Sequence, residues 1–221
     1  NRLNKVKKLK KQEQSESWGQ WILQVLILVA IFFGIFFVLN KYVFANLTVS
    51  GISMQPTFEN NDRVIALRHA KIKEGDIVIV DAPDEPGALY IKRVIGLPGD
   101  TIVSKNNQIY INGKKLNQPW LKAGQKLIDN GEDGISGTKY TNTQNFTLSS
   151  LAKTQNYRQF YTSKQLKEMQ KTNKVPANTY FVMGDHRSVS KDSRYIGTIP
   201  RSKIVGVVKM RYWPLNHITF Y

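Results

Sequence analysis

The feature that most constrains this chain is an uncharged, strongly apolar stretch near its start. Residues 17–40 contain no charged side chain, and Trp21–Leu39 consists almost wholly of Ile, Leu, Val, Phe and Ala. As a helix, this stretch would extend roughly 36 Å, which is enough to cross the apolar core of a bilayer. Trp18 and Tyr42 lie near its two ends, where interfacial aromatic residues are common. The sequence therefore predicts one transmembrane helix over residues 17–40.

A cleavable signal peptide is the alternative for this stretch, because Val43-Phe44-Ala45 has small residues spaced like a cleavage site. However, the apolar run exceeds the roughly 7–15 residues that are usual in a signal peptide. Lys41 also lies between the run and that site. These two observations favour a retained anchor.

The distribution of charge predicts the orientation of the anchor. Residues 1–16 hold six Lys or Arg side chains against Glu13 and Glu16. A lysine-rich flank normally stays in the cytoplasm. We therefore expect residues 1–16 to form a cytoplasmic basic tail and residues 41–221 to lie outside the plasma membrane.

The remaining charge indicates the kind of partner. The tail contributes +4 to the total net charge of +16, so the rest of the chain carries +12. On a membrane-tethered domain such a surplus favours anionic lipid as a partner. The interleaved aromatic and basic residues typical of nucleic-acid binding are missing, so we expect no nucleic-acid partner. The chain has no cysteine, and its three histidines lack metal-ligand spacing, so we expect no metal and no disulfide.

Beyond Ser53, short apolar runs alternate with Gly, Pro, Asn and Asp. Such runs predict strands, which fall at 63–67, 75–80, 89–95, 101–103, 108–111, 179–183 and 204–212. Asn112-Gly113 follows the fifth run and is a strong hairpin signal. The pattern predicts a mainly β domain that resembles a barrel or a sandwich.

Residues 105–176 have a different character, with many Asn, Gln, Lys, Gly and Thr residues. This composition predicts an inserted, irregular region with short strands around residues 144–148. A helix is expected over residues 163–171, with Leu166 and Met169 on one face.

The stretch Ser50–Thr57 can carry chemistry, because it combines two serines with Gly51 and Pro56 directly after an extended segment. A serine on such a turn can present its hydroxyl next to backbone N–H groups, as a nucleophile with an oxyanion hole requires. Taken alone, the stretch fits an ordinary polar turn better, since Ser, Gly and Pro are common turn residues.

Lys92 is a candidate general base, although the alternation of the strand does not settle whether Lys92 or Arg93 faces inward. Arginine keeps its proton in proteins, whereas a lysine removed from water can lose it. A desolvated Lys92 near Ser53 could be neutral near pH 8, whereas the structural alternative is a surface lysine. Further along, Gly184–Gly197 holds polar side chains between two apolar strands, and its Asp185, Asp192, Arg187 and Arg194 are expected to pair with one another.

Together, the anchor, Ser50–Thr57, Tyr90–Asp100 and Gly184–Gly197 resemble bacterial type I signal peptidases of the single-anchor, Gram-positive type. These are membrane-bound serine endopeptidases that remove N-terminal signal peptides from exported preproteins. The resemblance implies a catalytic domain formed by residues 41–104 and 177–221, β-barrel-like, with the smaller non-catalytic β-rich insertion at 105–176. It also implies cleavage after small residues at positions −1 and −3, through an acyl-enzyme and without a cofactor.

The resemblance also assigns roles to residues. It implies Ser53 as the nucleophile and main oxyanion donor, and Lys92 as the general base. Ser190 would orient the lysine, and Asp192 and Arg194 would support it. The positions that shape the substrate pockets match Val49, Met54, Tyr90 and Ile91. Two departures are that Gly51 stands where some relatives place a second serine, and His186 where asparagine is common.

Three alternatives compete with this interpretation. Ser150–Lys153 and Ser188–Lys191 match the S-x-x-K pattern of another serine enzyme class, but its companion motifs are missing. A Ser-His-Asp protease could use His186, but Gly-x-Ser-x-Gly is missing. A membrane-anchored binding or scaffold protein could keep the fold without activity, but the presence of Ser53, Lys92 and Ser190 argues against it.

Overall fold

The computed structural model describes residues 2–131 and 136–221, with side chains from Trp18 onward. Residue 1 of the expected tail and residues 132–135 of the expected insertion therefore lie outside the described residues. By its contacts the chain divides into two units, Asn1–Val43 and Phe44–Tyr221, and each is considered by itself.

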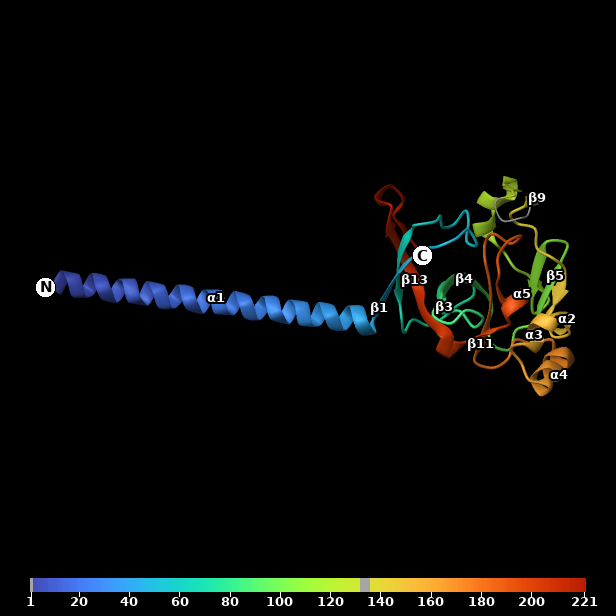
Figure 1. Ribbon diagram of the computed structural model, residues 1–221, viewed down its shortest axis with the longest axis horizontal. Coiled ribbons are helices and arrows are strands. Elements are labelled where there is room, and N and C mark those ends of the chain that lie inside the picture. The colour runs from blue at the N-terminus through green and yellow to red at the C-terminus, as the bar shows by residue number, and fades with distance from the viewer. Residues whose placement is uncertain (1, 132–135) are drawn as a thin grey trace. The chain divides into compact units, whose positions relative to one another are not determined.

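The described residues form fourteen strands and five α-helices (Figure 1). The helices are α1 (Arg2–Tyr42), α2 (Leu148–Leu151), α3 (Gln155–Arg158), α4 (Ser163–Thr172) and α5 (Ser193–Ile196), with short 3₁₀ turns at Pro119–Leu121, Ala123–Lys126, Arg201–Lys203 and Leu215–His217. The strands are β1 (Phe44–Thr48), β2 (Arg63–Leu67), β3 (Ile77–Asp81), β4 (Leu89–Gly96), β5 (Ile102–Lys105), β6 (Gln108–Ile111), β7 (Lys114–Lys115), β8 (Ile128–Asn130), β9 (Ser136–Lys139), β10 (Phe146–Thr147), β11 (Thr179–Met183), β12 (Ile199–Pro200), β13 (Ile204–Trp213) and β14 (Thr219–Phe220).

Helix α1 contains the predicted membrane-spanning segment. Its residues Trp18–Tyr42 are long and apolar enough to cross a membrane, and an 18-residue window within them has a mean hydropathy of 3.0. The helix begins at Arg2, well before the predicted start at residue 17. The preceding Lys-, Gln- and Glu-rich residues favour helix by themselves, and no proline or glycine interrupts them, so the backbone continues as one helix.

The large sheet of the second unit confirms the mainly β prediction. Its strands are hydrogen-bonded in the order β1-β2-β13-β3-β4-β11-β12, with β14 paired to β13, and every pair is antiparallel. The central strands β2, β3, β4 and β13 coincide with predicted strands to within two residues at each end. The pairings trace an open path from β1 to β12, so hydrogen bonds between described strands do not close the predicted barrel.

The expected insertion supplies β6, β7 and β10 of a second, four-stranded sheet in the order β10-β5-β6-β7, and a hairpin of β8 and β9. Strand β5 of this sheet lies almost wholly before residue 105, in the expected first part of the catalytic domain. Asn112 and Gly113 both have positive φ, 50° and 78°, and join β6 to β7 as the predicted tight turn. Helix α4 is capped by Thr162, whose hydroxyl accepts a hydrogen bond from the Gln165 N–H, and it buries Leu166 and Met169 as expected.

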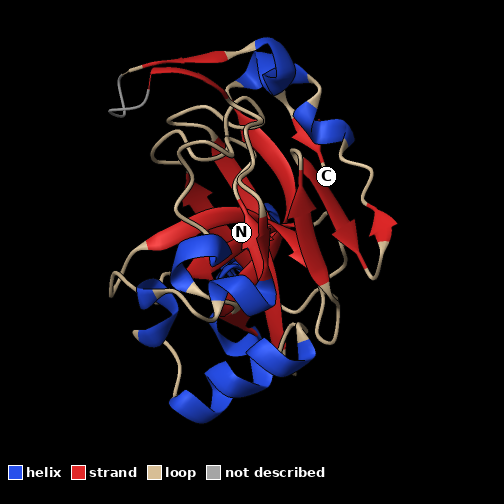
Figure 2. Ribbon diagram, turned by 90° about the vertical axis from the view of Figure 1, so that its right-hand side faces the viewer, coloured by secondary structure: helices blue, strands red, loops and turns tan. Residues whose placement is uncertain are grey.

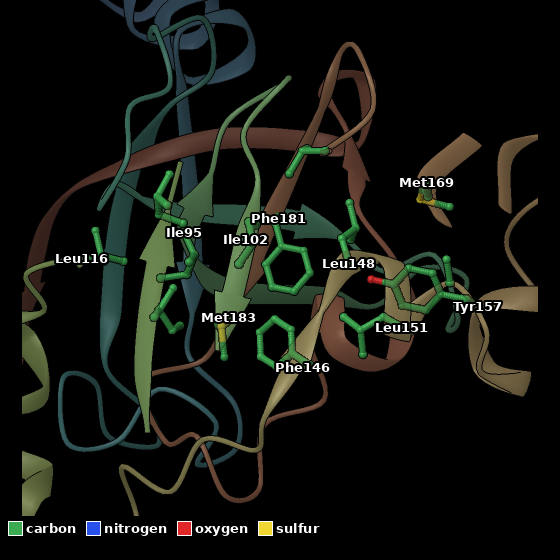
Figure 3. Close-up of a cluster of buried hydrophobic side chains, with 14 of the residues drawn as sticks. Ile95, Ile102, Leu116, Phe146, Leu148, Leu151, Tyr157, Met169, Phe181 and Met183 are labelled. Atoms are coloured by element: carbon green, nitrogen blue, oxygen red, sulfur yellow. The ribbon is translucent and has the colours of Figure 1, made fainter. Parts of the chain in front are cut away.

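A shared hydrophobic core joins this region to the large sheet. Phe181 of β11 stacks on Phe146 of β10 with ring centroids 5.7 Å apart, and both side chains are buried. Ile95 of β4 and Ile102 of β5 pack in the same cluster (Figure 3). In Figure 2 the strands run through the middle of the unit and the helices lie at its edges. Residues 44–221 therefore form one compact body, whose large sheet positions the polar residues described next.

Candidate active site

Ser53 lies on the loop between β1 and β2. The loop turns at Gly51, whose φ of 86° is in the left-handed region that glycine adopts freely. The Gly51 N–H donates to Asn60 Oδ1 at 3.1 Å, and the Gln55 N–H donates to the Ile52 carbonyl at 2.9 Å. Among the described residues, no acceptor binds the Ser53 N–H, so this donor is available to a ligand.

Lys92 of β4 meets this loop. Its side chain is buried, and Nζ lies 2.6 Å from Ser53 Oγ. Arg93, the next residue, is buried as well and binds Asp185 through two nitrogens, at 2.6 and 2.9 Å. Side chains alternate between the faces of a strand, and both faces of β4 are covered here. This is why the alternation pattern could not choose between the two cations.

The environment of Lys92 favours its neutral form. Burial lowers the pKa of Lys92 from 10.5 to about 8, although the nearby Asp192 carboxylate opposes the shift. No described carboxylate lies within ion-pair distance of Nζ. A lysine that is desolvated and lacks a bound carboxylate can accept a proton near neutral pH.

Asp192 and Arg194 hold the polar loop that follows β11. Asp192 accepts hydrogen bonds from the Gly184 N–H at 3.0 Å and from Arg194 Nε and Nη2 at 2.9 and 2.8 Å. Burial raises the pKa of Asp192, but the Arg194 charge and these hydrogen bonds more than offset it, so the pKa lies below its ordinary value. Arg194 Nη2 also donates to the carbonyl of Arg187 at 2.8 Å, which fixes the path of the loop.

Ser190 is brought to the same place without a hydrogen bond to Lys92. Its Oγ is buried and has no partner among the described residues. Ser190 lines a hollow of about 490 Å³ that also contains Ser53 and Lys92. The role of orienting the lysine therefore stays a prediction, which the position of Ser190 permits.

The lining of the hollow includes one of the four residues predicted to shape the substrate pockets. It is lined by Ser50, Gly51, Ile52, Ser53, Tyr90, Lys92, Ser188, Val189, Ser190, Lys191 and Tyr195. Of the four predicted pocket residues, Tyr90 lines it, whereas Val49, Met54 and Ile91 pack in a buried hydrophobic cluster. The Tyr90 hydroxyl donates toward Glu85 at 3.1 Å and Asp84 at 3.3 Å, while burial and the negative charge of Asp84 raise its pKa to about 12.

The ring of His186 has partners other than the Ser53 hydroxyl. Its Nε2 lies 2.6 Å from Asp129 Oδ1, its Nδ1 lies 3.2 Å from the Ile52 carbonyl oxygen, and Tyr140 stacks on its ring at 3.6 Å. Both ring nitrogens are thus engaged away from Ser53 Oγ. This geometry disfavours a Ser-His-Asp arrangement, although a His–Asp pair exists.

The expected pairing within Gly184–Gly197 is correct only for Asp192 and Arg194. Asp185 binds Arg93 and also accepts a hydrogen bond from the Thr57 hydroxyl at 2.6 Å. Both partners lie far from Asp185 in the sequence. The sequence shows the order of the charged residues along the chain but not which of them meet in the fold, so these contacts could not be predicted.

Among the described residues, no group of three or more His, Asp or Glu side chains could hold a metal ion.

Gly184 provides a test of how tightly the loop fits against Ser53. A Cβ at this position would overlap Ser190 Oγ and the Ser53 carbonyl oxygen. We expect Gly184→Ala to displace both residues and to lower turnover on the order of 10²-fold, because small displacements at a reacting centre are costly. Gly124→Ala is the matched control, since its Cβ would meet Pro56 and Tyr140 at 3.5 Å, an ordinary contact. Near-normal turnover in Gly184→Ala would contradict the fit.

Comparison with known proteins identifies the family of this chain. The family model for signal peptidase, peptidase S26, matches residues 18–213. Signal peptidase IB of Staphylococcus aureus (strain MRSA252) is 33% identical over 203 residues, covering 90% of this chain and 93% of the relative. Signal peptidase I of Bacillus caldolyticus is 33% identical over 215 residues, covering 95% and 97%.

A crystal structure of a signal peptidase I from Enterococcus faecalis V583 is 32% identical, covers 62% of this chain and 97% of that chain, and has a TM-score of 0.46. The family match spans most of the sequence, and the N-terminal apolar helix fits a membrane anchor. The chain therefore belongs to the S26 family of signal peptidases, and it is a membrane-anchored serine endopeptidase that removes signal peptides.

Proposed function

We propose that this enzyme cuts signal peptides from exported preproteins with Ser53 as the nucleophile and Lys92 as the general base. The observation that carries the proposal is the 2.6 Å contact between Ser53 Oγ and a buried Lys92 Nζ whose pKa is lowered to about 8 by burial. A serine hydroxyl is a weak nucleophile unless a base within hydrogen-bonding distance removes its proton. The contact and the lowered pKa support Lys92 in this role.

The reaction would proceed in two halves. Ser53 Oγ attacks the carbonyl carbon of the scissile bond while neutral Lys92 takes the hydroxyl proton, and the Ser53 N–H stabilises the oxyanion. When the C–N bond breaks, Lys92 gives its proton to the leaving amine. Water, deprotonated by Lys92, then attacks the acyl-enzyme and restores Ser53. Gly51 offers no side-chain hydroxyl, so a second oxyanion donor would come from another group.

The polar loop after β11 would support this chemistry. Asp192 and Arg194 neutralise each other at 2.8 Å and fix the backbone around Ser190. The buried Ser190 hydroxyl would then turn toward Lys92 and orient its lone pair. No metal or cofactor takes part in the proposed steps.

Replacing the base tests the mechanism directly. Lys92→Arg keeps the charge and bulk but removes the ability to become neutral. We expect turnover of a signal-bearing precursor to fall on the order of 10³-fold or more, while circular dichroism shows an unchanged fold. His186→Ala is the companion variant and should keep much of its activity, because His186 does not contact Ser53 Oγ. A Lys92→Arg enzyme with a near-normal rate would place the base elsewhere.

The sheet offers a place for an extended substrate. Strand β3 pairs with β4 along Leu89–Arg93, but β11 pairs with β4 only from Arg93 onward. The edge of β4 that faces away from β3 is therefore unpaired over Leu89–Lys92 among the described strands, next to the hollow around Ser53. A peptide that adds to this edge would gain main-chain hydrogen bonds and send its −1 and −3 side chains to the same side.

The substrate preference follows from the room beside Ser53. The hollow is bounded by Ile52, Tyr90, Val189 and Tyr195, and it must hold main chain as well as side chains. We expect precursors with Ala at −1 and −3 to be cut and a matched precursor with Phe at −1 to stall, because the larger side chain displaces the carbonyl from Ser53. Peptide cleavage in detergent measures both rates. Equal rates would contradict the pocket, even if Ser53 and Lys92 keep their roles.

The orientation of the anchor belongs to the proposal as well. The six basic residues before the apolar segment would keep residues 1–16 in the cytoplasm and place residues 41–221 outside. The net charge of +12 outside the tail favours contact with anionic lipid.

Protease accessibility tests this orientation. Protease added to sealed cells without their wall should digest the C-terminal unit, and a cytoplasmic protein in the same cells serves as the control for sealing. Full protection of residues 44–221 would reverse the orientation.

A further inference from the structure

The loop Gly184–Gly197 contains one arginine, Arg187, whose charge is not neutralised by a carboxylate of the loop. Asp185 binds Arg93 and Asp192 binds Arg194, each at 2.6–2.8 Å. Arg187 is 1% exposed, and no described carboxylate lies within ion-pair distance of it. Its charge is thus buried without a counter-charge in contact.

Arg187 instead contacts three neutral acceptors. Its guanidinium donates to the Gly184 carbonyl at 2.9 Å, to Gln118 Oε1 at 2.7 Å and, weakly, to Thr143 Oγ1 at 3.4 Å. An arginine has five N–H donors, so two remain for another ligand. Burial lowers the pKa of Arg187 only to about 10, so the group is a cation at neutral pH. Burying a cation without an anion is costly.

A hollow of about 160 Å³ lies against this guanidinium. It is lined by Thr138, Asn142, Gln144, Arg187, Ser188 and Arg194. Every one of these side chains carries a hydrogen-bond donor, and none is acidic. The Ser188 Oγ is buried and has no partner among the described residues. The hollow therefore combines positive charge, unused donors and room for a small ion.

We propose that this hollow binds a small tetrahedral oxyanion, such as phosphate or sulfate, between Arg187 and Ser188. The planar fork of an arginine matches the oxygen spacing of such an ion. The charge of +12 outside the tail raises the local concentration of anions. Because Ser188 also lines the hollow around Ser53, the ion would brace the loop that carries Ser190.

Thermal unfolding of the full chain in neutral detergent tests the site, independently of turnover. Inorganic phosphate at about 50 mM should raise the unfolding midpoint by about 3 °C or more relative to sodium chloride of equal ionic strength. A parallel sample contains glycerophosphoglycerol, the soluble headgroup of an anionic lipid. A rise with phosphate alone assigns the site to the free ion, and a rise with both extends it to headgroups. Equal midpoints in phosphate and chloride would overturn the proposal.

Variants locate the ion. Arg187→Met should lose the phosphate-dependent rise. The control Arg201→Met should keep it, because within the described part of the chain Arg201 donates to the carbonyls of Ile204 and Arg68 and does not line the hollow. Ser188→Ala removes one donor without changing charge and should raise the phosphate concentration needed for half the rise about fivefold. It serves alone if Arg187→Met does not fold. If a folded Arg187→Met or Ser188→Ala variant responds to phosphate as the unchanged protein does, the ion binds elsewhere and the proposed site is refuted.

Discussion

The site depends on one buried contact, that between Lys92 Nζ and Ser53 Oγ. Removing an ammonium from water costs free energy, which lowers the pKa of Lys92 from 10.5 to about 8. Between these two values the unfolded chain binds the proton more tightly than the folded chain does. The free energy of unfolding therefore rises as the pH rises through this window, and below pH 8 the full cost of about 3 kcal/mol applies. The fold tolerates this cost in stability. Because the pKa of Lys92 is lowered, the lysine can act as a base.

The surrounding charges are arranged so that Lys92 is not held in its charged form. Asp185 is bound by Arg93, and Asp192 is bound by Arg194, so the two nearest loop carboxylates already have cations of their own. A carboxylate in direct contact with Nζ would stabilise the ammonium and raise its pKa. The Arg93–Asp185 pair also ties the loop after β11 to β4, and the hydrogen bond from the Thr57 hydroxyl to Asp185 ties it to the loop of Ser53. Structure and reactivity therefore depend on the same buried carboxylates.

The sequence was sufficient for the elements whose signals are local. A few neighbouring residues are enough to predict the helix of the apolar run, the Asn112-Gly113 turn and the short alternating strands. The cap formed by Thr162 and the apolar face of α4 also depend on residues that are close together in the sequence. The resemblance to the family added which serine and which lysine to consider together, and the structure places them 2.6 Å apart.

Contacts between distant segments could not be predicted in this way. The binding of Asp185 to Arg93 and of His186 to Asp129 depends on how β4, β11 and the inserted region pack. The expectation that Val49, Met54 and Ile91 shape the substrate pockets came from their place beside the motifs and stays a prediction, and the sequence did not show that all three side chains are buried in one hydrophobic cluster. Helix α1 extends beyond the membrane-crossing stretch because helix propensity, and not only hydropathy, decides where a helix begins.

The central claim is that burial lets Lys92 lose its proton near pH 8 and act as the base, and its protonation can be measured directly. The full chain, labelled with ¹⁵N at its lysine side chains, would be titrated by NMR in detergent, and Lys92→Met would identify the Nζ signal. The proposed mechanism predicts that this signal titrates with a midpoint near pH 8, well below the ordinary value of 10.5. A midpoint near 10.5 would show that Lys92 stays charged beside Ser53, and it would contradict its role as the base.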